Sequence, residues 1–87
     1  MLHERNDAPT VALRALAWIL GDVQRSSRFL ALTGLAPDDL RDRIADPELH
    51  AAVVAFLAGQ ESDLIACAGD IGLAPEAIQA AARDLRA

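Results

Sequence analysis

The sequence contains no lysine and no tyrosine, and it has only one cysteine, two phenylalanines and one tryptophan. Its eight basic residues are therefore all arginine, and thirteen acidic residues leave a formal net charge of −5. This balance disfavours binding to nucleic acid phosphates or to an anionic membrane, because both require clustered positive charge. The lone Cys67 cannot form an internal disulfide, so we expect a small buried side chain in a reducing compartment, with a reactive thiol as the alternative.

Long apolar runs are missing as well. The most apolar window, residues 11–20, is about half the length needed to span a bilayer and contains Arg14. Residues 1–7 are polar and carry both signs of charge, which predicts a flexible N-terminal tail and not a signal peptide. We therefore expect one domain over residues 8–87 in the cytoplasm, without membrane association.

The patterns of catalytic and metal sites are absent. His3 and His50 are far apart and have no clustered ligand spacing with the single cysteine, so we expect His50 to be a surface histidine and predict no metal site. There is no glycine-rich phosphate loop, no nucleophile elbow and no serine with plausible histidine and acid partners. These absences predict a chain that is not an enzyme and has no cofactor.

Acidic residues gather between positions 38 and 48, which suggests either a cation site or a solvated helical face. The second interpretation is favoured because each residue has a local role. Asp38 lies at a helix N-terminus, Asp39 and Arg43 have the spacing of an ion pair, and Asp46 is placed to cap a helix.

An internal repeat is the main feature that the sequence does have. A shift of 38 residues pairs every proline and four of the five glycines, and the tetrapeptide at 34–37 recurs intact at 72–75. Because glycine and proline mark where helices and turns begin and end, we interpret residues 9–46 and 47–84 as a duplication. The pairs are Pro9 with Pro47, Gly21 with Gly59, Gly34 with Gly72 and Pro37 with Pro75.

The paired residues predict where helices begin and end. Proline fits the first turn of a helix, and glycine fits the left-handed position just past a helix end. The sequence therefore predicts an all-α fold, a compact bundle of two three-helix repeats in a pseudo-two-fold arrangement. The expected helices are 8–20, 22–33, 37–45, 47–58, 61–71 and 75–86.

The first and fourth predicted helices are apolar on nearly all sides. A helix of this kind is usually buried on all sides, so we place the two against each other at the centre of the bundle. The unpaired Gly69 lies inside the fifth predicted helix, where it marks either close packing or a break.

Four segments of the chain, residues 12–20, 29–41, 45–49 and 56–73, resemble in composition and order a small bacterial family, domain of unknown function 3572. The resemblance runs from about Thr10 to Leu85. It implies a stand-alone short protein of the bacterial cytoplasm with no assigned reaction, cofactor or partner.

Three functions remain open. The first is a non-enzymatic protein interaction or structural module, and the second is a ligand-binding or enzymatic domain with a core pocket. The third is a nucleic-acid binder, since residues 30–37 followed by a helix have the form of a helix-turn-helix. That helix would present three aspartates and two arginines to the phosphates, so a basic stripe of Arg14, Arg25 and Arg28 would be needed to support it.

The two repeats differ in their third helices, because alanines of the second repeat stand where the first carries aspartates. Such a small apolar face admits close packing of another helix. We therefore predict that this face binds an unknown protein partner or self-associates weakly, with closure of the bundle as the alternative. Its residues are Ala77, Ile78, Ala81 and Leu85.

Overall fold

A computed structural model describes residues 7–86, which form six helices and no strand. The predicted all-α bundle is thereby confirmed. The predicted N-terminal tail lies outside the described residues apart from Asp7, which instead caps the first helix. The helices are α1 (Ala8–Leu20), α2 (Val23–Thr33), α3 (Pro37–Asp42), α4 (Pro47–Ala58), α5 (Glu61–Ile71) and α6 (Pro75–Arg86).

Aspartate side chains define the starts of three helices. Asp7 accepts a hydrogen bond from the backbone N–H of Thr10 at 2.9 Å, and Asp22 accepts one from Arg25 at 2.9 Å. Asp46 accepts from the backbone N–H of Glu48 at 2.9 Å, as predicted for a cap. Each bond satisfies an N–H group that has no partner inside its helix, which stabilises the start.

The predicted left-handed glycines are confirmed at two positions and wrong at two. Gly34 and Gly72 have φ of 74° and 77° at the ends of α2 and α5. Gly21 and Gly59 have φ of −75° and −78°, in the right-handed region. The difference arises because only one residue separates each of these two glycines from the next helix, so the chain continues its right-handed turn instead of reversing.

The third helix is shorter than predicted and ends at Asp42 instead of residue 45. The predicted ion pair between Asp39 and Arg43 is also wrong. The Asp39 carboxylate turns back to accept a hydrogen bond from the backbone N–H of Ala36 at 2.8 Å. Arg43 pairs with Asp46 at 3.2 Å, so its side chain holds the link between α3 and α4.

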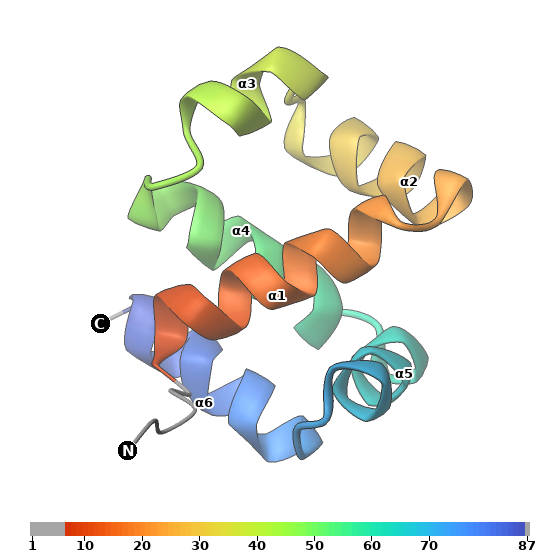
Figure 1. The fold of residues 1–87 in the computed structure, drawn as a ribbon, viewed down its shortest axis with the longest axis vertical. Coiled ribbons are helices and arrows are strands. Elements are labelled where there is room, and N and C mark those ends of the chain that lie inside the picture. Colours follow the sequence, from red (N-terminus) through yellow and green to blue (C-terminus); the bar gives the residue numbers. More distant parts are fainter. Residues whose placement is uncertain (1–6, 87) are drawn as a thin grey trace, which may run out of the picture.

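The core lies where α1, α4 and α6 pack against one another. Figure 1 shows α1 crossing α4 at the centre, with α2 and α3 on one side and α5 and α6 on the other. The predicted central pair of apolar helices is therefore confirmed. Burial on all sides is not, because Leu13 and Leu20 of α1 remain 37% and 43% exposed.

The two predicted repeats give the same order of helices, but their third helices take different places. α6 packs on both α1 and α4, whereas α3 has only six residues and lies at the far end of the molecule beside α2 (Figure 1). A pseudo-two-fold arrangement therefore does not extend to α3 and α6. Superposition of the first two helices of each repeat stays a prediction.

Gly69 lies within the last turns of α5 and neither breaks the helix nor packs closely against a neighbour. A Cβ atom added there would meet nothing within 4 Å. We therefore expect Gly69→Ala to stabilise the chain by about 0.5–1 kcal/mol in urea unfolding. Gly72→Ala, the matched control three residues later, should destabilise it by about 1 kcal/mol because its φ is positive. Equal unfolding midpoints for the two variants would contradict this account of α5.

Candidate functional site

The predicted partner face is largely inside the monomer. Ile78 is fully buried and Ala81 is 3% exposed, while Ala77 and Leu85 are partly buried. These side chains belong to the helix that packs on α1 and α4. Closure of the bundle, the alternative, accounts for the buried Ile78 and Ala81, whereas Leu85 keeps part of its surface at the end of α6.

The three arginines of the possible basic stripe are each held by other groups of the chain. Arg14 donates a hydrogen bond to the backbone oxygen of Ile71, and Arg28 pairs with Asp63. Arg25 stacks on the ring of Trp18, with its Cζ atom 3.6 Å from the ring centroid. These engagements give no support to a free basic surface for nucleic acid.

Helix α3, the possible recognition helix, is short and acidic. Asp38 and Asp42 are exposed, and Asp39 is used to cap the helix. The backbone N–H of Glu48 and the side chain of Arg43 lower the pKa of Asp46 below its ordinary value. The acidic residues thus have the local roles that a solvated helical face predicts, and they would repel phosphates.

The Cys67 thiol is fully buried in α5, as predicted for a structural cysteine. Burial raises its pKa to about 11, and the carboxylate of Asp70 adds to the effect. The thiolate is therefore scarce at neutral pH. A raised pKa also means that stability should be lost as the pH rises above the value of the unfolded chain, about 8.5.

We expect native Cys67 to react with iodoacetamide at pH 8 about 200 times more slowly than the unfolded chain, because the thiolate is the reacting form. Mass spectrometry of samples quenched over time, with and without 8 M urea, measures both rates. Similar rates in the two conditions would contradict the burial of this thiol and favour the reactive-thiol alternative.

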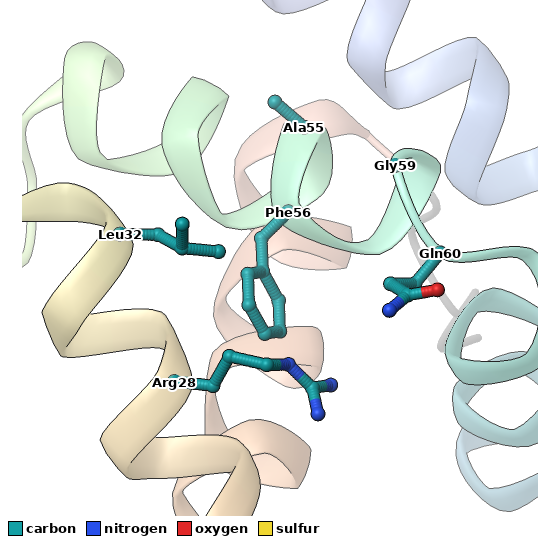
Figure 2. Close-up of a pocket in the computed structure, with 6 residues that line it drawn as sticks. All are labelled: Arg28, Leu32, Ala55, Phe56, Gly59 and Gln60. Carbon is teal, nitrogen blue, oxygen red and sulfur yellow. The ribbon is translucent and has the colours of Figure 1, made fainter.

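A mixed polar and apolar pocket lies between α2 and the end of α4. Figure 2 shows Arg28 reaching past the ring of Phe56 toward the side on which Gln60 lies. The Arg28 Cζ atom is 5.3 Å from the centroid of that ring. Because the guanidinium already forms an ion pair with Asp63 and packs on the ring, it is poorly placed to bind an anionic ligand. The pocket has a volume of about 370 Å³ and is lined by Arg28, Leu32, Ala55, Phe56, Gly59 and Gln60.

A second concavity is larger and almost wholly apolar, and we call it the Leu13–Ile44 groove. It lies where the start of α1, the link between α3 and α4, the first turn of α4 and the end of α6 meet. Its volume is about 470 Å³. Leu13 and Ile44 contribute half-exposed side chains. Its lining residues are Pro9, Leu13, Ile44, Ala45, Pro47, His50 and Leu85.

His50 is the polar member of this groove, and its expected position on the surface is wrong. The residue is only 4% exposed. Its Nε2 atom lies 2.7 Å from the backbone oxygen of Ile44. The sequence does contain a sign of this burial, because His50 stands on a helix that is otherwise apolar nearly all round.

Neither a metal cluster nor a single spanning helix is found in residues 7–86. No three His, Cys, Asp or Glu side chains converge there so as to hold a metal ion. No single helix of this part is long and apolar enough to cross a membrane. Only α4 and α5 taken together reach that length and composition, and they are bent by 113° relative to each other.

Comparison with known proteins identifies the family but adds no site. No curated protein and no solved structure shows significant similarity to the chain. The family described as "Protein of unknown function (DUF3572)" matches residues 5–87, which is essentially the whole chain and agrees with the resemblance seen in the sequence. The chain therefore belongs to the DUF3572 family.

Proposed function

We propose that this chain is a non-enzymatic protein interaction module, and that its Leu13–Ile44 groove binds an apolar segment of a partner protein. The observation that carries the proposal is an apolar concavity of about 470 Å³ with two half-exposed aliphatic side chains at its walls. Concave apolar surface of this kind on a small domain commonly marks a binding site.

The construction of the groove supports this proposal. Residues from three parts of the chain meet there, and Pro9 and Pro47 fix the directions in which α1 and α4 begin. Proline in a first helical turn is held at a φ that needs little adjustment on binding. The parts of the groove that the two prolines fix therefore lose less conformational entropy when a partner binds.

The two alternative functions have weaker support. The Arg28–Phe56 pocket has polar groups, but its strongest charge is already paired with Asp63. A nucleic-acid surface would need free arginines, and Arg14, Arg25 and Arg28 are engaged elsewhere. We extend the proposal to the bacterial cytoplasm, because a buried free thiol is compatible with a reducing compartment.

The proposal predicts that Ile44→Glu weakens partner binding at least tenfold, because a carboxylate at the wall of the groove cannot be buried against an apolar segment without a large cost. Ile65→Glu is the matched control. Ile65 is 54% exposed, close to the 45% of Ile44, but it lies on α5 and does not line the groove. Wild type and both variants are used as baits in cells that express this chain naturally, followed by quantitative mass spectrometry and by calorimetry with the purified partner.

A partner retained by the wild type and by Ile65→Glu, with affinity reduced at least tenfold by Ile44→Glu, would support the proposal. Equal retention by all three baits would contradict it. Sedimentation of the purified chain measures its oligomeric state and tests whether the groove binds a second copy. A dimer that Ile44→Glu dissociates would show that the groove is filled by a second copy and would overturn the proposal of a separate partner.

A further inference from the structure

The imidazole of His50 has one nitrogen in use and one without a partner. Its Nε2 atom lies 2.7 Å from the oxygen of Ile44, and a carbonyl oxygen can only accept. Nε2 therefore carries the proton, and in the neutral ring Nδ1 is an acceptor. That Nδ1 atom is buried and has no hydrogen-bond partner among residues 7–86. A buried acceptor without a donor lowers stability, so it calls for an explanation.

The position of this ring suggests the explanation. His50 lines the Leu13–Ile44 groove, and the other six lining residues have purely apolar side chains. The lining residues carry no acidic side chain and the nearby Asp46 is already paired with Arg43, so burial of a charged donor such as lysine is unfavourable. A ligand with a large apolar part and one neutral donor would fit the groove better. Its apolar part would be buried against the lining, and its donor would pair with Nδ1.

This inference rests on the proposed function. We propose that the groove binds an aromatic side chain with one neutral donor, the indole of a tryptophan in the partner, and that the indole N–H donates a hydrogen bond to Nδ1 of His50. Indole combines a large apolar area with a single N–H group. Ile44 lies in the non-helical link between α3 and α4 and is 45% exposed. Because Nδ1 is buried, the donor reaches it only when a side chain at the wall of the groove moves on binding.

The test uses two probes of nearly the same shape, indole and benzofuran, which differ in that only indole has an N–H group. Each is titrated into isotope-labelled wild-type protein at pH 7.5. Amide shifts of residues 9–13 and 44–50 report occupation of the groove, and long-range ¹H–¹⁵N spectra report the state of both nitrogens of His50. A neutral acceptor nitrogen shifts measurably when a donor binds it.

We expect both probes to shift the groove amides, with indole binding about three- to tenfold more tightly, as one hydrogen bond to a buried neutral acceptor implies. Only indole should shift Nδ1. His50→Leu leaves no nitrogen at the position of Nδ1 and no side-chain acceptor in its place. This variant should bind the two probes equally.

Equal affinities of the two probes for the wild type, with no change at Nδ1, would overturn the inference while leaving the apolar groove and the proposed function intact. An Nδ1 signal that is already that of a hydrogen-bonded nitrogen and does not respond to indole would assign water as its donor, and would overturn the inference too. Absence of amide shifts with either probe also overturns it. The proposed function fails separately, through the Ile44→Glu experiment.

Discussion

Replacing Ala81 with glutamate is expected to destabilise the chain severely. Ala81 is 3% exposed on α6, the helix that packs on both α1 and α4. The glutamate would place an uncompensated charge in the core, which costs about 3–5 kcal/mol, and its extra atoms would overfill the packing. A domain of this length has a total stability of roughly 4–13 kcal/mol, so the substitution would remove a large part of it, and all of it at the low end of this range.

Circular dichroism and urea unfolding measure this loss. Gln79→Glu is the matched control, because Gln79 lies two residues away on the same helix and is exposed. It should unfold at nearly the wild-type midpoint. A folded Ala81→Glu variant with an altered oligomeric state would contradict the present account and would restore the face of Ala77, Ile78, Ala81 and Leu85 as a partner surface.

The second large effect is expected at Phe29, which anchors α2 to the core. Its ring is fully buried and meets the ring of Phe56 edge to face, with centroids 5.3 Å apart and planes at 85°. Phe29→Ala should lower the free energy of unfolding by about 3–5 kcal/mol, because it removes this contact and leaves a cavity.

Leu32→Ala provides the comparison, since Leu32 is on the same helix and 72% exposed. Its effect on the free energy of unfolding should stay below about 1 kcal/mol. Denaturant titrations of the wild type and both variants, followed by tryptophan fluorescence, measure the difference. Similar midpoints for the two variants would show that α2 is not held by Phe29.

The positions of the helices could be predicted because the residues that start and end a helix act locally. Proline has no N–H group to donate, and glycine tolerates a positive φ, so both act within one turn of where they stand. The exception was α3. Its end depends on whether Arg43 pairs back along the helix or forward with Asp46 and Glu48, and both pairings have acceptable spacing.

The groove was harder to predict because it depends on the contacts between helices. Pro9, Ile44 and Leu85 are remote in the sequence and meet only because α6 returns to the start of α1. The same sequence spacing predicted equal places for α3 and α6, yet only α6 covers the central pair. The open side that α3 leaves is where Leu13 and Ile44 remain exposed.

The central claim is that the Leu13–Ile44 groove is the surface that binds a partner. Amide hydrogen exchange, measured with and without the partner whose retention depends on Ile44, tests this claim most directly. The account predicts slower exchange in residues 9–13 and 44–50 and at the end of α6, with little change around Arg28 and Phe56. Protection confined to the Arg28–Phe56 pocket or to α5, with residues 44–50 unchanged, would contradict it.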